Sequence, residues 1–206
     1  MPLSHHPIIL ASASRARAAM LEQAGVEVIR KPAIIDEDEV KHSFRAAGMK
    51  AEEVAEALAE LKAERIARRH ASAVPSTLIV GADQMLECDG VWFDKPTDRA
   101  SARTQLQTLR GKQHRLISCA VVLVNGQRVW HHTDQARLHM RALTDRFIDA
   151  YLDAAGDTAL QSVGAYQLEG LGAQLFARIE GDFFTILGMP LLPLLDFLRV
   201  RGVLPT

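Results

Sequence analysis

The sequence is poor in the features that mark several large classes of protein. Among its 206 residues only Cys88 and Cys119 are cysteines, so one disulfide is the most that could form. The N-terminus shows no basic segment followed by a long apolar core, so we predict no secretory signal and expect free thiols in a reducing cytoplasm. The apolar stretch 187–198 is short and contains two prolines and an aspartate, which argues against a membrane span.

An excess of charge of either sign is also missing. The formal net charge at pH 7 is -1, so no overall basic field would attract nucleic acid, and any anion site must be local. Apolar residues make up 48% and charged residues 24%, ordinary values for a globular protein long enough to bury a core. Repeats and low-complexity linkers are absent, so we expect a single domain over residues 1–206.

The stretch 77–84 is the most informative part of the chain. Residues 77–80 are apolar and partly β-branched, which predicts a buried strand. We expect this strand to end in the small residues Gly81 and Ala82, with Asp83 and Gln84 following it. Ligands of α/β sheets bind outside the carboxyl ends of strands, so an acid here is well placed for chemistry. The alternative is that Asp83 caps a turn.

An anion site is predicted near the start of the chain. Residues 8–11 are typical of a short buried strand, and 18–24 of a helix. Ser12 or Ser14 would cap that helix, whose free N–H groups attract anions. Arg17 would add bidentate phosphate contacts. A capped helix with solvated arginines is the alternative interpretation.

Two further segments contain charged residues that could serve such a site. The acidic run 36–39 could supply a magnesium ligand, although such runs are more often solvated loops. Residues 51–70 have a clear helical period. Lys62 falls between Leu58 and Ile66 on the apolar side of this helix. It would either extend to the surface or reach from the buried face toward an anion.

The second half of the chain has strong turn and helix signals. The pair Asp89-Gly90 predicts a two-residue hairpin that would return Lys95 toward Asp83, as a salt bridge or as a phosphate clamp beside a base. Asn125-Gly126 predicts another hairpin between strands 115–124 and 127–138. Helices are predicted to start at residue 97 or 98 and run to 109, and to span 144–155 and 190–201, with a glycine-rich loop at 162–173.

Together these segments resemble the Maf family of nucleoside triphosphate pyrophosphatases, the homologues of the septum formation inhibitor. The resemblance runs from about Ile8 to Arg201, and its motifs occur in order. They are 10–14 with Arg17, 36–37, Lys62, 81–83, 95–96, 109–111 with His114, 164–166 with 169–172, and 181–190. Each motif alone is weak, but eight in register are specific.

The resemblance implies an α/β fold of the Maf and ITPase-like type. In such a fold an elongated, twisted, mixed sheet is flanked by helices, with a cleft between two lobes. It also implies a cytoplasmic, house-cleaning hydrolase of nucleotide metabolism. The expected reaction converts a nucleoside triphosphate into a monophosphate and pyrophosphate with the help of Mg²⁺ or Mn²⁺.

Residue roles follow from the same resemblance. Asp83 would activate the attacking water, either as general base or through the metal. Glu37 is the first metal ligand that we expect, with Asp83 as the second. Five residues are expected to bind the phosphate oxygens of the substrate, namely Ser12, Ser14, Arg17, Lys62 and Lys95.

Recognition of the nucleobase of the substrate is assigned to Gln84 and Glu169. The branch of the family that acts on dTTP and UTP usually has Thr and Gln at these two places, so this chain is more similar to the branch that hydrolyses 7-methyl-GTP. That branch often has Trp where Ala16 stands, so a base-stacking surface is expected to be missing here.

A binding-only regulator of cell division is the alternative from another functional class, because Maf proteins are linked by name to septum arrest. A protein that only binds a triphosphate has little need of a carboxylate near it, so Asp83 argues against this alternative. The expected partner is a nucleoside triphosphate, with no nucleic acid and no membrane. The sequence leaves a homodimer open.

Overall fold

The computed structural model, which describes residues 3–70 and 77–206, is an α/β structure built on one mixed sheet. The chain divides into two compact units. The first comprises Met1–Gln84, Ser118–Asp134 and Gly188–Thr206, and the second comprises Met85–Ile117 and Gln135–Leu187. Within the described ranges no helix has the length and apolarity needed to cross a membrane.

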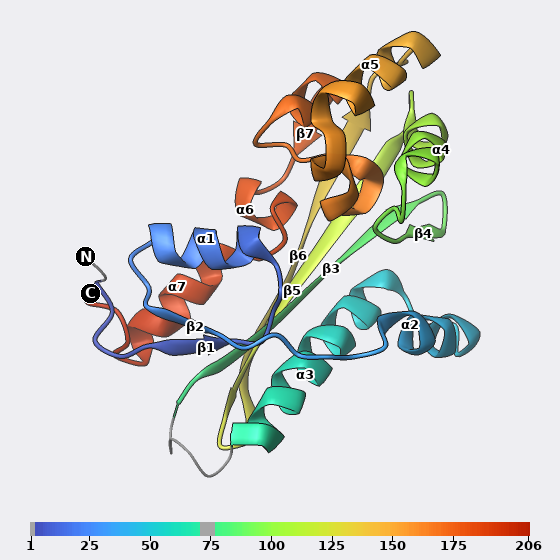
Figure 1. Cartoon of the computed structure of the whole chain (residues 1–206). Helices are drawn as coiled ribbons and strands as arrows, with labels where there is room; N and C mark the ends of the chain where they lie inside the picture. The colour runs from blue at the N-terminus through green and yellow to red at the C-terminus, as the bar shows by residue number, and fades with distance from the viewer. Residues whose placement is uncertain (1–2, 71–76) are drawn as a thin grey trace. The chain divides into compact units, whose positions relative to one another are not determined.

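The sheet has seven strands in these ranges, in the order β2-β1-β3-β5-β6-β7, with β4 paired to β3 (Figure 1). β1 runs parallel to β2 and to β3, whereas the pairs β3–β4 and β6–β7 are antiparallel. The mixed sheet that the resemblance implies is therefore confirmed. The strands are β1 (Ile8–Leu10), β2 (Val28–Arg30), β3 (Ile79–Cys88), β4 (Val91–Phe93), β5 (Gln113–Val124), β6 (Gln127–Met140) and β7 (Phe176–Glu180).

In the first unit, helices cover the parallel strands, and α1 and α3 lie on opposite sides of β1 and β2 (Figure 1). The helices of this unit are α1 (Arg15–Gln23), α2 (Glu37–Ala46), α3 (Ala51–His70) and α7 (Leu191–Val200). Val54 and Leu58 of α3 are fully buried, as the apolar period predicts. The backbone N–H of His5 donates to the carbonyl of Val203 at 2.8 Å, which brings the two ends of the chain together.

Gly81 sets how closely α3 packs on β3. A Cβ atom added at Gly81 would lie 2.0 Å from the carbonyl oxygen of Ala59 and 2.9 Å from the Cβ of Ala63. Both alanines are fully buried. The helix backbone can therefore approach the strand this closely only because Gly81 has no side chain.

The second unit has its own apolar core between its sheet and its helices. These helices are α4 (Arg99–Leu109), α5 (Asp145–Ala155) and α6 (Phe183–Ile186), with 3₁₀ turns at Gly156–Gln161, Val163–Ala165 and Leu171–Leu175. Leu106, Leu138 and Ile148 are fully buried in this core. Thr144 caps α5 as predicted, and Asp98, one of the two candidates that the sequence offered, caps α4.

Both predicted hairpins are confirmed. Cys88 and Val91 pair across the turn Asp89-Gly90, and both turn residues have positive φ angles, 53° and 78°. Asn125 and Gly126 have φ angles of 52° and 78° between β5 and β6. These angles are those of the type I′ turns that Asn-Gly and Asp-Gly favour.

Two predictions about secondary structure are wrong, and one strand was missed. The acidic run 36–39 is no loop, because Asp36 caps α2 and accepts a hydrogen bond from the N–H of Glu39. Acidic side chains in a first turn stabilise a helix through its dipole, a signal that the sequence contained. β7 was not predicted, since it is a short strand with mostly exposed side chains. Pro190 precedes α7 as its N-cap, because its ψ of 81° is not helical.

The predicted position of Asp83 at the end of a strand is also wrong. β3 continues to Cys88, so Asp83 lies in its interior. β1 pairs with β3 only as far as Leu10 and Val80, so this parallel neighbour ends before Asp83. On its other side β3 has β5 as its neighbour. Asp83 therefore lies beyond the carboxyl end of β1 rather than of its own strand.

Candidate functional site

Three of the predicted site residues meet at one ammonium group in the first unit. Lys62 Nζ lies 2.5 Å from Asp83 Oδ1 and 2.7 Å from Glu37 Oε1. Lys62 belongs to α3, Asp83 to β3 and Glu37 to the first turn of α2. Three elements far apart in sequence thus bring one cation and two carboxylates together.

This cluster is largely shielded from water. Lys62 is 7% exposed and Asp83 is 4% exposed, whereas Glu37 is half-buried. The stem of Lys62 shares the buried side of α3 with Leu58 and Ile66, so Lys62 reaches inward rather than to the surface. This position settles the two alternatives that the helical period left open.

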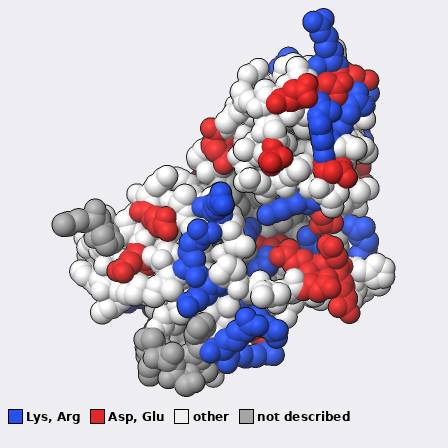
Figure 2. Space-filling model, in the orientation of Figure 1, with Lys and Arg blue, Asp and Glu red and all other residues white. Residues whose placement is uncertain are grey.

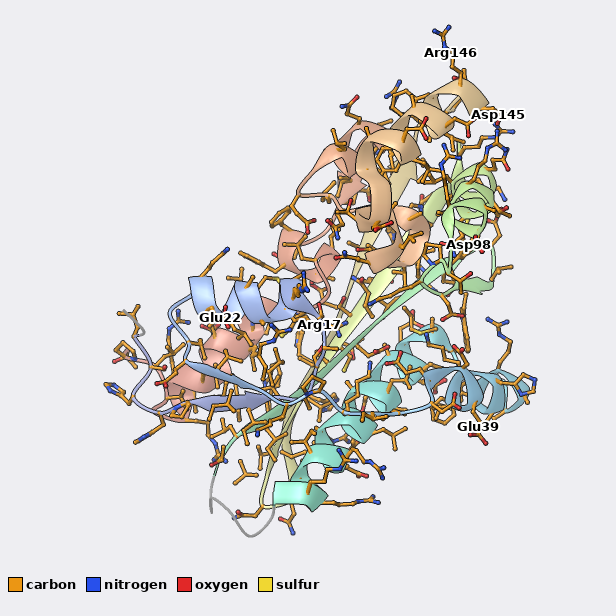
Figure 3. The ribbon with its side chains drawn as sticks, viewed as in Figure 1. Arg17, Glu22, Glu39, Asp98, Asp145 and Arg146 are labelled. Carbon is orange, nitrogen blue, oxygen red and sulfur yellow. The ribbon has the colours of Figure 1, made fainter. Side chains whose placement is uncertain are left out.

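The electrostatics of Glu37 keep its carboxylate charged. Burial by itself would raise the pKa of Glu37, but the ammonium of Lys62 and its hydrogen bond, with smaller contributions from Lys41 and Arg17, leave the pKa below its ordinary value. Other acidic side chains gather on the surface over α2 (Figure 2). Glu39, for example, is exposed on the outer side of this helix (Figure 3).

Asp83 has one oxygen that is buried without a hydrogen-bond partner. Oδ1 accepts from Lys62, but Oδ2 has no partner among the described residues. An unpaired carboxylate oxygen out of water is costly, so it usually marks a place where a ligand, a metal or a reacting water is bound.

Arg17, on α1 in the first unit (Figure 3), is a buried residue that binds three acceptors. Its Nε donates to the carbonyl of Gly188 at 2.7 Å, and its Nη1 donates to the carbonyl of Ala82 at 2.9 Å and to Ser12 Oγ at 3.2 Å. Burial lowers the pKa of Arg17, and the charges of Asp83 and Glu37 oppose this shift. The guanidinium therefore interacts electrostatically with both carboxylates of the cluster.

The turn before α1 has the capping geometry that the sequence predicts. Ser14 caps α1 by accepting from the N–H of Arg17 at 3.3 Å, and Ser12 Oγ accepts from the N–H of Ser14 at 3.2 Å. Both hydroxyls can still donate. Ala16, in the first turn of α1, is half-buried.

Gln84 is held by a residue that the sequence analysis missed. Its Nε2 donates to Ser118 Oγ at 3.0 Å. Ser118 is fully buried on β5, next to the apolar residues Ile117 and Cys119. A serine inside such a buried run is the signal that could have identified it, because a buried hydroxyl needs a partner.

The remaining two predicted site residues, Lys95 and Glu169, belong to the second unit. Lys95 is exposed just beyond β4, and Glu169 is exposed in a turn where the N–H of Gly170 donates to the carbonyl of Gln167 at 3.3 Å. The approach of Lys95 to Asp83 stays a prediction, as does the assignment of Glu169 to the base.

A metal would have two carboxylates to bind here. No cluster of three or more His, Cys, Asp and Glu side chains that could hold a metal occurs in residues 3–70 and 77–206. Mg²⁺, however, is commonly bound by one or two carboxylates together with substrate phosphates and water. Glu37 and Asp83, with the unpaired Oδ2, fit that kind of site.

Comparisons with known proteins identify the family to which the chain is similar. A family model described as Maf-like protein matches residues 7–201. A protein of Paramagnetospirillum magneticum named nucleoside triphosphate pyrophosphatase is 58% identical over 196 residues, which cover 95% of this chain and 99% of that one. A protein of the same name from Granulibacter bethesdensis is 54% identical over 197 residues, covering 96% and 98% of the two chains.

Among solved structures, one similar chain is a nucleoside-triphosphatase / dITP/XTP pyrophosphatase from Mycobacterium abscessus. It aligns with 96% of this chain and 94% of its own length, with a TM-score of 0.46 and 15% identity.

Proposed function

This chain belongs to the Maf family, and we propose that it hydrolyses a nucleoside triphosphate at the α-phosphorus to give a nucleoside monophosphate and pyrophosphate. The shared name of its relatives supports this reaction. The observation that carries the proposal is the pairing of Lys62 with both Asp83 and Glu37, in the electrostatic range of Arg17.

Phosphoryl transfer depends on positioning and on electrostatic stabilisation rather than on covalent work by the protein. The ammonium of Lys62 has three donors, so it can hold a phosphate oxygen while it keeps both carboxylates. Arg17 uses Nε and Nη1 for protein acceptors, and no hydrogen bond among the described residues involves Nη2, which we assign to a phosphate oxygen. Ser12, Ser14 and Lys95 complete the phosphate contacts.

We assign the divalent cation to Glu37 and Asp83. Burial and the unpaired Oδ2 of Asp83 support this assignment, as does the lowered pKa of Glu37, which keeps that ligand ionised. When bound, Mg²⁺ or Mn²⁺ would neutralise charge on the triphosphate. Asp83 then has one of two roles, as the base that takes a proton from the attacking water or as a ligand of the metal.

For the base we propose a 7-methylguanine-type substrate, recognised by Gln84 and Glu169. 7-Methylguanine offers N1–H and an amino group as donors and carries positive charge, which a carboxylate such as Glu169 favours. Thymine and uracil offer no such charge. We therefore rank 7-methyl-GTP above dTTP and UTP, while the small Ala16 makes a roomier pocket.

Pyrophosphate release from a panel of nucleotides tests the reaction. The expected result is equimolar monophosphate and pyrophosphate from 7-methyl-GTP in the presence of Mg²⁺, with lower kcat/KM for dTTP and UTP and no release in excess EDTA. Tight nucleotide binding without release would support the binding-only regulator instead. A preference for dTTP or UTP that Glu169→Gln leaves unchanged would overturn the assignment of Glu169.

A further inference from the structure

We propose that a buried hydrogen-bonded network around His114 and Tyr166 holds the loop 162–172 in one conformation and thereby sets the base preference of the enzyme. The network also includes Gln105 and Tyr151. All four are positioning residues that act through Glu169, which this loop carries. The proposal thus rests on the proposed role of Glu169.

The centre of the network is a bond between two side chains in the core of the second unit. His114 Nε2 and the Tyr166 hydroxyl are 2.7 Å apart. His114 is 1% exposed and Tyr166 is 4% exposed, and Phe176 packs edge-on against the tyrosine ring with 4.8 Å between ring centroids. Polar groups at this depth lose water, so each depends on the other as its partner.

Two more side chains bind the backbone of the loop just before Tyr166. Tyr151 of α5 donates from its hydroxyl to the carbonyl of Ala165 at 3.1 Å. Gln105 of α4 accepts from the N–H of Gly164 at 3.1 Å. Three consecutive loop residues are therefore each bound by a side chain from a different element, namely α4, α5 and β5.

The backbone that these bonds hold is one that a free loop would rarely adopt. Ala165 has a φ of 62°, which costs energy for a residue with a Cβ. Gly164 has a φ of 77°, and a Cβ there would lie 2.6 Å from Leu86 Cδ1. A Cβ at Gly172 would lie 2.3 Å from the carbonyl oxygen of Gln167. Such a conformation persists only where its surroundings enforce it.

Glu169 follows Tyr166 by three residues and is itself exposed. The position of its carboxylate therefore depends on the backbone that carries it, and that backbone is anchored at residues 164–166. Burial lowers the pKa of His114 to about 4, so the ring is neutral near pH 7 and the bond to Tyr166 is made in its uncharged form. Apolar side chains could fill this core equally well, so the polar network is best explained as a device that specifies one loop conformation.

The test compares three full-length variants with the wild type. Tyr166→Phe and Tyr151→Phe each remove one hydroxyl and keep the ring, and His131→Gln is the control, because His131 is an exposed residue of β6 whose ion-pair partner is Glu56 rather than a residue of the network. Two quantities are measured for each protein. The first is kcat and KM for 7-methyl-GTP, dTTP and UTP, and the second is amide hydrogen exchange over residues 162–172.

For Tyr166→Phe we expect the preference in kcat/KM among the three nucleotides to fall about tenfold, mainly through KM, the size of effect that one lost buried hydrogen bond can have. We expect exchange of the loop amides to accelerate by a similar factor, with the same direction in Tyr151→Phe and no change in His131→Gln. An unchanged preference with unchanged exchange would overturn the proposal, as would equal effects in His131→Gln.

The loop measurement separates this proposal from the proposed function. A wild type that releases pyrophosphate from no nucleotide would refute the function and, with it, the effect on base preference. Faster exchange confined to the two tyrosine variants would then still support the role of the network in holding the loop. An active wild type whose preference in kcat/KM is unchanged in Tyr166→Phe would refute only the network's role in setting the base preference.

Discussion

Arg17 and Gly188 are joined by a hydrogen bond of 2.7 Å from the Arg17 Nε to the Gly188 carbonyl, across 171 positions of sequence. The same guanidinium binds the carbonyl of Ala82, the residue before Asp83. Arg17 therefore ties α1, β3 and the segment before α7 to one another around the proposed catalytic residue. One side chain contributes both to the stability of the first unit and to the charge of the site.

Arg17→Lys should destabilise the protein although it conserves the charge. A lysine ammonium cannot reach two carbonyls and a hydroxyl in the fork geometry of a guanidinium. We expect a loss of about 3 kcal/mol in the free energy of unfolding, measured by urea denaturation. Arg15→Lys, at an exposed position in the same turn, is the control and should change stability by less than about 0.5 kcal/mol. Equal midpoints for the two variants would contradict the structural role of Arg17.

Asp83→Asn should abolish most turnover while it leaves the fold intact. The change is nearly isosteric and removes only the negative charge, and Lys62 keeps Glu37 as a partner. We expect kcat to fall by about 10²-fold or more, the usual scale for a positioned base. Asp38→Asn on the exposed side of α2 serves as the control. Near-normal pyrophosphate release by Asp83→Asn would remove Asp83 from the mechanism.

Lys62 and Arg65 lie one turn apart on α3 but have opposite environments. Lys62 is buried against Asp83, whereas Arg65 is exposed. We expect Lys62→Ala to raise KM for the triphosphate and to lower kcat, because it removes a phosphate contact and leaves Asp83 buried without a cation. Arg65→Ala should have steady-state kinetics close to the wild type. A silent Lys62→Ala beside a defective Arg65→Ala would show that the wrong face of α3 has been assigned to the substrate.

Gly81→Ala should be among the most destabilising single-methyl changes in the chain. The added Cβ would overlap the backbone carbonyl of Ala59 at 2.0 Å, so α3 has to move away from β3. We expect a loss of about 3 kcal/mol, measured by thermal or urea unfolding, together with reduced activity because Lys62 moves with its helix. Gly170→Ala is the control, since its φ is negative and the nearest atom to its new Cβ is 4.0 Å away. A Gly81→Ala protein as stable as this control would contradict the close packing described above.

Protonation of His114 should make the protein less stable in mild acid. Burial, with a smaller contribution from the nearby His139, lowers its pKa from 6.5 to about 4, so the folded state resists a proton that the unfolded chain accepts. The contribution of neutral His114 to the free energy of unfolding is fully present above pH 6.5. It is lost as the pH falls toward 4 and stays lost below pH 4. The loss amounts to about 3 kcal/mol at most.

Urea midpoints at pH 7.5, 5.5 and 4.5 check this pH dependence, because wild type and His114→Gln share every other titrating group. Tyr166 faces His114, and its pKa lies well above 10 because it is buried, so it stays neutral throughout. The wild type should lose more stability than His114→Gln over this range. Parallel curves for the two proteins would show that His114 does not titrate in the way described.

Local signals predicted most of the secondary structure. The turns at Asp89-Gly90 and Asn125-Gly126 depend on residues close in sequence, and the structure has both where they were predicted. The caps Ser14 and Asp98 are each one of the two neighbouring candidates that the sequence offered. β7 was missed because a short exposed edge strand has no apolar alternation of its own and forms through its pairing with β6.

The predicted site also has a part that local sequence signals show and a part that they do not. Ser12, Arg17, Glu37, Lys62 and Asp83 could be named from the sequence, since each residue type and its motif are visible there. Their arrangement could not. Nothing local shows that Lys62 binds both carboxylates or that Arg17 binds Gly188, because these contacts join residues that only the packing of α1, α2 and α3 around β3 brings together.

The sequence by itself determined the turns, the caps, the helical and strand periods and the residue types available for phosphate and metal binding, because each follows from conformational preferences within a few residues. Only the tertiary structure decided that β3 continues past Asp83, that Ser118 binds Gln84 and that His114 pairs with Tyr166. The physical reason is common to all three. A buried polar group must find its partner wherever the fold brings one within about 3 Å, and that distance has no counterpart in sequence separation.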